Sequence, residues 1–209
     1  PLTMVKSYAE MIRDLSGDNP EKRNSHLQVI IDEADRLNIL VSDMLTMSRL
    51  QSGVSKLEKT VFSIKEATES ILQSYGVLVE QEGYLILFDC PDNLKVYADE
   101  AKIKQVISNL LNNAVKYCGT DRTVYVSVKK QSGKVRFEVT DHGMGIEPSE
   151  LEHIWERYYK ASTNHVRATG GSGLGLSIVK NILSLHNVDF GVNSKLGVGS
   201  TFWFELKLA

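Results

Sequence analysis

The chain has 209 residues, of which 42% are hydrophobic and 24% are charged, and its formal net charge is −2. A chain of this length holds one large domain or two modest ones, and the composition is typical of a soluble globular protein. The nearly balanced charge gives no reason to expect nucleic acid or a membrane surface as a binding partner.

Residues 1–54 have the pattern of an antiparallel helical hairpin. Apolar residues recur at steps of three and four on both sides of the segment 16–20, whose Gly17, Asp18, Asn19 and Pro20 break a helix. The second helix carries a heptad-like seam of Leu27, Ile30, Ala34, Leu37, Val41 and Met44. Two helices cannot bury stripes this wide, so we expect two chains to form a dimeric four-helix bundle. Docking of the hairpin on the rest of its own chain is the alternative.

A charged, polar linker follows the hairpin and leads to a second domain, residues 60–209. Strand-like patterns cover 61–64, 84–90, 94–97, 124–128, 135–139, 189–193 and 200–208, and helical patterns cover 65–82 and 99–117. Strands and helices mix without regular βαβ alternation. This predicts an α+β fold, a sandwich with helices on one face of a mixed sheet.

The helix predicted for 99–117, which Asp99 can cap, has two distinct faces. One is an apolar stripe of Ile103, Ile107, Leu110 and Ala114. The other carries Asn109, Asn113, Lys116 and Tyr117. Because asparagine is a poor helix former, two of them on one stripe suggest a use beyond folding. A polar helix edge is the plain alternative.

The segment Asp141–Ile146 follows directly on a predicted strand, with glycines at alternate positions, Gly143 and Gly145. Glycines let the backbone approach a flat ligand closely. The carboxylate of Asp141 can then accept a hydrogen bond from an exocyclic amine. An ordinary turn has the same pattern.

A second glycine cluster, with Gly171, Gly173 and Gly175, leads into an apolar helix. Free amides and the positive end of the helix dipole favour a phosphate at this position. The GxxxxGK[ST] pattern of a P-loop is absent, and no preceding strand completes a dinucleotide-binding unit. A glycine-rich loop without a ligand is the alternative.

Two further features of the sequence concern the cell compartment: the cysteines indicate a reducing one, and the apolar runs bear on a membrane span. The two cysteines, Cys90 and Cys118, show neither metal-type nor paired spacing. No apolar run approaches the roughly 18 residues that span a bilayer, and no signal peptide is visible. We therefore expect a cytoplasmic piece that need not be a whole protein.

Taken in order, five motifs resemble the N, G1, F, G2 and G3 boxes of sensor histidine kinases. They are NLLNNAVKY (109–117), DHGMGI (141–146), IWERYYK (154–160), GGSGLGLSIVK (170–180) and GVGSTFWF (197–204). The resemblance covers about 60–209 and implies a Bergerat-type α/β sandwich that binds ATP with Mg²⁺. The hairpin 1–54 resembles the family's dimerisation and phosphotransfer domain. The resemblance further implies a homodimer, a response-regulator receiver domain as partner, and a bacterial membrane sensor as parent, joined to the membrane only through upstream segments.

The resemblance also implies roles for single residues on the predicted helix and its neighbouring loop. Asn113 would coordinate Mg²⁺, with Asn109 facing the same pocket, Lys116 reaching a phosphate and Tyr117 near the base. At the adenine end the resemblance implies that Asp141 accepts a hydrogen bond from the adenine amine. The residues around it would be Gly143, Gly145, Ile146 and Thr201.

The resemblance also implies roles for residues of the F and G2 boxes. Gly171, Gly173, Leu174, Gly175 and Leu176 would belong to the lid over the triphosphate, and Tyr159 and Lys160 would line the ribose and phosphates. Trp155 stands where the family usually has Phe, and Lys160 where Arg is common. Lysine keeps the charge but loses the bidentate fork of arginine.

Asn109 favours a kinase over a hydrolase. The gyrase and MutL-type relatives have a Glu at this position, which activates water. A carboxamide has no useful basicity near neutral pH and cannot act as a general base. Water attack should then be slow, which keeps ATP for a histidine nucleophile.

The family's H box, roughly His-Glu-Leu-Arg-Thr-Pro-Leu, is only partly visible, because the sequence opens Pro1-Leu2. The acceptor histidine is expected five residues before Pro1, outside the printed sequence. His26, on the second predicted helix, stands in a different place. We therefore expect that this chain binds Mg-ATP but does not phosphorylate itself.

Three other functions remain open on the residues alone. A degenerate kinase without kinase activity would be a binding module that acts through its hairpin, with or without bound nucleotide. A serine kinase of the anti-sigma-factor type shares the ATP-binding fold but lacks a preceding hairpin. An ATP hydrolase driving conformational change is disfavoured by Asn109.

Overall fold

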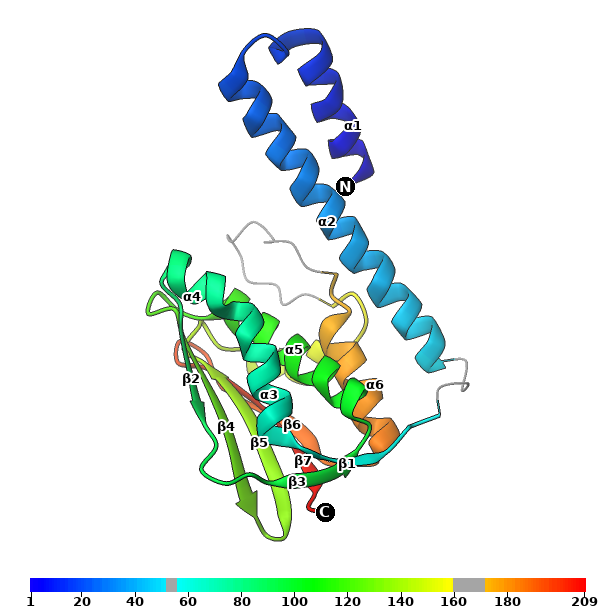
Figure 1. Ribbon diagram of the computed structural model, residues 1–209, viewed down its shortest axis with the longest axis vertical. Coiled ribbons are helices and arrows are strands. Elements are labelled where there is room, and N and C mark those ends of the chain that lie inside the picture. Colours follow the sequence, from blue (N-terminus) through cyan, green and yellow to red (C-terminus); the bar gives the residue numbers. More distant parts are fainter. Residues whose placement is uncertain (52–55, 160–171) are drawn as a thin grey trace.

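A computed structural model of the chain describes all residues except 52–55 and 160–171. It consists of a helical hairpin followed by a layered α/β domain (Figure 1). The hairpin comprises α1 Leu2–Met11, a π-helical turn Ile12–Ser16 and the long α2 Pro20–Gln51. The Ser16 hydroxyl donates to the carbonyl of Met11, 3.1 Å away, which suits the widened turn of a π-helix. The predicted hairpin and its break before Pro20 are confirmed.

The predicted apolar seam of α2 is only partly covered within one chain. Leu27, Val41 and Met44 remain 41%, 53% and 56% exposed. The shorter α1 lies along the N-terminal half of α2, and the other half of α2 passes beside α6 (Figure 1). Met47 is buried there, with its sulfur near Asn181 of α6. Docking of the hairpin on its own chain therefore covers a limited part of α2. The rest of the seam is an uncovered apolar surface.

Strands of the second domain form two sheets. They are β1 Thr60–Ser63, β2 Leu85–Asp89, β3 Lys95–Ala98, β4 Thr123–Gln131, β5 Lys134–Asp141, β6 Phe190–Lys195 and β7 Gly199–Lys207. The main sheet has the order β2-β4-β5-β7-β6; β2 and β4 run parallel and its other neighbouring pairs are antiparallel. β1 and β3 form a separate antiparallel pair.

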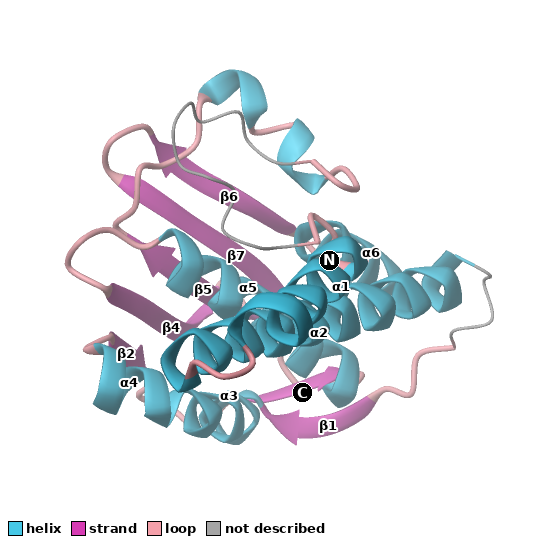
Figure 2. Cartoon of the chain, turned by 90° about the horizontal axis from the view of Figure 1, so that it is seen from above, coloured by secondary structure: helices cyan, strands magenta, loops and turns pink. Residues whose placement is uncertain are grey.

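Helices cover one face of the main sheet (Figures 1 and 2). They are α3 Ile64–Leu72, α4 Gly76–Glu82, α5 Glu100–Tyr117 and α6 Gly175–His186, with 3-10 turns at Gln73–Tyr75, Pro148–Glu150 and His153–Trp155. The α+β sandwich expected from the sequence is confirmed. Among the helices described, none combines the length and the apolar character needed to cross a membrane.

The single helix predicted for 65–82 is wrong, because the turn Gln73–Tyr75 divides it. Tyr75 is buried and its hydroxyl donates to Oδ1 of Asn112 on α5, at 2.6 Å. Burial raises the pKa of Tyr75 to about 12. This tether turns the chain at a point where Gly76, a poor helix former, weakens a continuous helix.

The core fixes the rotation of α5. Asp99 caps the helix by accepting from the Lys102 amide at 3.1 Å, as predicted. All members of the predicted apolar stripe are buried, namely Ile103, Ile107, Leu110 and Ala114. Facing the helices, the rings of Phe137 and Phe204 stack with centroids 4.9 Å apart. Because the apolar stripe points into this core, the asparagine stripe lies at the edge of the sandwich.

A buried junction joins the linker to α5 and α6. Oδ2 of Asp99 accepts from the Glu58 amide at 3.1 Å, and the Asp99 amide donates to Nε2 of His186 at 3.1 Å. Nδ1 of His186 lies 2.8 Å from the carbonyl of Ile182. These two contacts require a neutral ring, with Nδ1–H as donor and Nε2 as acceptor. Burial lowers the pKa of His186.

The junction predicts a pH-dependent stability. An unfolded histidine has a pKa of about 6.5, and burial lowers that of His186, so the unfolded state binds the proton more readily. The contribution of His186 is therefore complete above about pH 6.5 and is lost as the pH falls from there through the lower folded pKa. Urea unfolding at pH 5 to 8 should show a smaller pH slope in His186→Gln than in wild type. The exposed His153→Gln is the contrast: its hydrogen bond with Glu156 raises the pKa of His153, which opposes the slope, so removing it should not make the slope smaller. A His186→Gln slope equal to that of wild type would contradict the prediction.

Candidate functional site

The second stripe of α5 begins at Asn109, where this helix meets the N-terminal end of α6. Asn109, Asn113 and Lys116 are half-buried, and Tyr117 is exposed. Nδ2 of Asn109 points to the carbonyl of Gly175 at 3.4 Å, which brings the predicted magnesium stripe and the predicted lid together. The Lys116 ammonium lies 4.8 Å from the centre of the Tyr117 ring, a cation–π distance.

Asp141 forms the buried floor of the site at the end of β5. Its side chain is 4% exposed, and Oδ1 accepts from the Gly143 amide at 2.9 Å. Burial raises the pKa of Asp141, and hydrogen bonds from the Gly143 and Ser200 backbones only partly oppose this rise. A desolvated carboxylate of this kind gains from a further hydrogen-bond donor, which suits the predicted role toward an amine.

Glycines are required in the loop after Asp141. A Cβ on Gly143 would lie 1.8 Å from the carbonyl oxygen of Tyr117, and one on Gly145 would lie 2.1 Å from that of Lys195. Gly145 also has a φ of +70°. The Ile146 amide donates to Oγ of Ser194 at 2.8 Å and holds the loop on β6. The loop is thus clamped between the C-terminal end of α5 and the β6–β7 turn.

The N-terminal end of α6 forms the third wall. Leu174 is buried, Leu176 is half-buried, and the helix begins at Gly175. The carbonyl of Gly173 accepts from the Tyr158 amide at 2.9 Å. The first amides of a helix have no intrahelical acceptor, so this end can bind an anion.

The F-box-like stretch is described up to Tyr159. Its hydroxyl donates to Oε1 of Glu150 at 3.2 Å, and its ring lies 5.8 Å from that of His153. Trp155 packs against Phe190 and Phe202 and is partly buried against the core. The predictions for Lys160 and Gly171 lie outside the described residues.

The structure does not pair Thr201 with Asp141, beside which it was predicted. In the β5–β7 register Thr201 pairs with Thr140, and their hydroxyls lie 2.9 Å apart. The buried residues of β7 alternate, and Thr201 is on the opposite face from them. Ser200 is the residue opposite Asp141, and it is buried. The alternation of side chains along β7 was the signal that identifies Ser200 instead.

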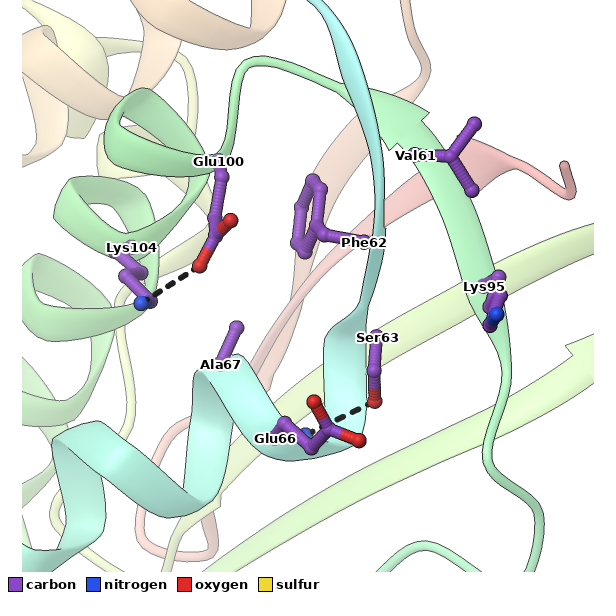
Figure 3. A pocket seen from close by; sticks show the side chains of 8 residues that line it. All are labelled: Val61, Phe62, Ser63, Glu66, Ala67, Lys95, Glu100 and Lys104. Atoms are coloured by element: carbon purple, nitrogen blue, oxygen red, sulfur yellow. Dashed lines mark hydrogen bonds and ion pairs between the residues drawn. The ribbon is translucent and has the colours of Figure 1, made fainter.

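An open cavity of about 430 Å³ lies away from this site (Figure 3). It is lined by Val61, Phe62, Ser63, Glu66, Ala67, Lys95, Glu100 and Lys104. These side chains come from β1, α3, β3 and the first turns of α5, whereas the predicted ATP-binding residues of α5 begin at Asn109. The ion pair of Lys104 and Glu100, 2.7 Å apart, closes one side. The cavity contains none of the predicted site residues.

The site fits a nucleotide in its chemistry. It joins a buried acceptor, a backbone cleared of Cβ atoms, two carboxamides and a helix end that favours anions. The described residues include no group of three or more His, Cys, Asp or Glu side chains that could hold a metal. A magnesium ion here would therefore depend on Asn113 and on oxygens of a bound phosphate.

Comparisons with known proteins agree with this arrangement. Residues 98–209 match the family described as histidine kinase-, DNA gyrase B-, and HSP90-like ATPase, and residues 1–53 match the His Kinase A (phospho-acceptor) domain. Sensor histidine kinase YkoH of Bacillus subtilis is 32% identical over 200 residues, which cover 96% of this chain and 43% of the relative. The chain spans about half the length of the curated relatives it matches.

Solved structures give the same result. The crystal structure of full-length ShkA in complex with AMPPNP has a TM-score of 0.74 and 26% identity, and the match covers all of this chain and 46% of that one. The structure of histidine kinase ThkA in complex with response regulator protein TrrA has a TM-score of 0.76 and 25% identity, with 99% and 57% covered. The chain therefore belongs to the histidine kinase-, DNA gyrase B- and HSP90-like ATPase family, and the phospho-acceptor hairpin before its ATPase domain gives it the domain pair of sensor histidine kinases.

Proposed function

We propose that this chain binds Mg-ATP between α5, the Asp141 loop and the start of α6, and that it supplies the catalytic core of a protein-histidine kinase. The observation that carries the proposal is that α5 meets two distant segments along one stripe: the start of α6 lies at Asn109, and the loop after the buried Asp141 lies against the end of the helix at Tyr117. The AMPPNP complex of ShkA supports the choice of nucleotide. Titration with Mg-AMPPNP by calorimetry tests it, and an absence of heat would contradict it.

Different residues of the chain are proposed to bind the adenine, the ribose, the phosphates and the magnesium ion. Asp141 accepts from the adenine amine, and Gly143 and Gly145 leave room for the ring. Lys116 and the first amides of α6 hold phosphate oxygens. Tyr159 and Lys160 are proposed at the ribose and phosphates, and Asn113 as the ligand of magnesium. When bound, magnesium would neutralise phosphate charge and orient the γ-phosphoryl group.

Asn109 is proposed to suppress hydrolysis. Its carboxamide lies at the carbonyl of Gly175, near the proposed phosphate end, and it cannot take a proton from water. Asn109→Glu should raise the basal release of phosphate about tenfold or more, because it adds a general base there. Asn109→Gln is the matched control, since it has the same length without the basicity. Equal phosphate release in both variants would contradict the role.

The phosphoryl acceptor is proposed to be a histidine upstream of Pro1. His26 is engaged within the hairpin, with Nδ1 3.0 Å from Oγ of Ser16 and its ring 5.3 Å from that of Tyr8. With γ-labelled ATP we expect no label on the chain of residues 1–209, and an acid-labile label on a chain extended upstream by one or two helical turns. Stable label on His26 would contradict this assignment.

The uncovered seam of α2 is proposed as a homodimer interface. Within one chain Leu27, Val41 and Met44 remain exposed, and a second hairpin would cover them. Val41→Glu should lower the mass measured by light scattering from that of a dimer to that of a monomer. Ser42→Glu, at the next and also exposed position, should leave the mass unchanged. A response-regulator receiver domain is proposed as the second partner, on the precedent of the ThkA–TrrA complex.

A further inference from the structure

The hairpin helix α2 contacts the proposed nucleotide site of its own chain. Oδ2 of Asp43 accepts a hydrogen bond from Oγ of Ser172 at 2.7 Å. One turn further along α2, Met47 is 5% exposed, and its sulfur lies 3.9 Å from Nδ2 of Asn181 on α6. The contact therefore has a charged part at the start of α6 and a second part, at the buried Met47, farther along that helix.

Ser172 links the carboxylate of α2 to the end of α6. While it donates to Asp43, its hydroxyl oxygen accepts from the Leu174 amide at 3.1 Å. Leu174 is the N-cap residue of α6, and its own side chain makes no capping hydrogen bond. The hydroxyl of Ser172 is thus polarised between a helix amide and a negative charge. A charge-assisted hydrogen bond of this kind is stronger than a neutral one.

The position of Asp43 creates a conflict with a nucleotide. The N-terminal end of a helix attracts an anion, and Asp43 places its carboxylate one side chain away from that end. Phosphates bound at the first amides of α6 would be repelled by this carboxylate, since both are negative. They would also compete with it for the hydroxyl of Ser172.

We propose that Asp43 and Ser172 form a latch that docks the ATPase domain on α2 and competes with nucleotide phosphate for the end of α6. The inference rests on the proposed nucleotide site. Because the two events are linked, nucleotide binding weakens the docked contact by the same factor by which docking weakens nucleotide binding. Asp43 is then a positioning residue, which acts on the nucleotide through Ser172.

Calorimetry with Mg-AMPPNP tests the competition. Asp43→Asn should bind roughly three- to tenfold more tightly than wild type, because it removes the negative charge that opposes phosphate and leaves the hydroxyl of Ser172 in place. Asp35→Asn, which removes the same charge at an exposed position on the same helix, is the matched control and should bind like wild type.

Energy transfer between dyes tests the docking itself without nucleotide. Dyes on Ser48→Cys of α2 and Lys207→Cys of β7, in a Cys90→Ser, Cys118→Ser background and diluted into unlabelled chain, report the distance between hairpin and domain. Transfer should change when Mg-AMPPNP is added, and Asp43→Asn should already show that change without it.

The outcomes separate the two proposals. If wild type binds nucleotide, and Asp43→Asn alters neither the affinity nor the energy transfer, the latch is overturned and the nucleotide site stands. If neither wild type nor any variant binds nucleotide, the nucleotide site is overturned, and the proposed competition is overturned as well. This holds whatever effect Asp43→Asn has on the distance between hairpin and domain.

Discussion

Asp141→Asn should weaken the binding of Mg-AMPPNP by about 100-fold, which is the largest effect expected from a single side chain of the site. The carboxylate is 4% exposed, so water does not replace a lost contact. The variant keeps the shape of the side chain, but it removes the charge that attracts a donor. The new side-chain NH2 group is a hydrogen-bond donor, and so is the adenine amine, so the two groups cannot pair when they face each other. Calorimetry measures the affinity, and thermal unfolding checks that the variant folds.

Asp121→Asn is the matched control for this prediction. It removes the same charge beside the same loop, but Asp121 is exposed and pairs with His142 at 2.8 Å. An exposed pair contributes little, so nucleotide affinity should change by about twofold or less. Equal losses in both variants would mean that overall charge, rather than the buried acceptor, governs binding. An Asp141→Asn protein that binds like wild type would remove Asp141 from the site.

Gly143→Ala should lower the free energy of unfolding by about 3 kcal/mol and abolish nucleotide binding. Its Cβ would lie 1.8 Å from the carbonyl oxygen of Tyr117 and 2.9 Å from Oδ1 of Asp141. The first clash is with backbone, which cannot rotate away as a side chain can. The loop must therefore shift away from α5, and the Gly143 amide that holds Asp141 shifts with it.

Gly76→Ala provides the contrast. A Cβ on Gly76 meets no atom within 4 Å, and this glycine is the first residue of α4. Alanine is a better helix former than glycine, so stability should be unchanged or higher by up to about 1 kcal/mol. Urea unfolding of both variants compares the two glycines directly. A Gly143→Ala protein as stable as Gly76→Ala would contradict the close approach of the loop to α5.

Patterns that depend on one element were predicted correctly from the sequence. The apolar stripe of α5 and its Asp99 cap depend on local spacing, and the structure has both. The strands predicted at 124–128 and 135–139 are β4 and β5, which pair as a hairpin through a turn with positive φ at Ser132 and Gly133. The position of Asp141 at the end of a strand was likewise predicted from the chain itself, and β5 ends there.

Features that depend on distant contacts were missed. The helix predicted for 65–82 looks continuous in sequence, and its interruption depends on the hydrogen bond of Tyr75 to Asn112. Thr201 was predicted from its place in a motif, whereas the neighbours of a strand residue depend on register, and this register pairs Ser200 with Asp141 and Thr201 with Thr140. The contact of Asp43 with Ser172 joins residues 129 positions apart, and no periodicity records it.

The most direct test of the nucleotide site is an NMR titration of the labelled protein with Mg-AMPPNP, which reports every perturbed backbone amide. We predict that the largest shifts fall on Asn113, Gly143, Gly145 and Gly175, with small shifts around the cavity of Phe62 and Ala67. Large shifts at that cavity with none in the Asp141 loop, or no shifts at saturating nucleotide, would contradict the proposed ATP site.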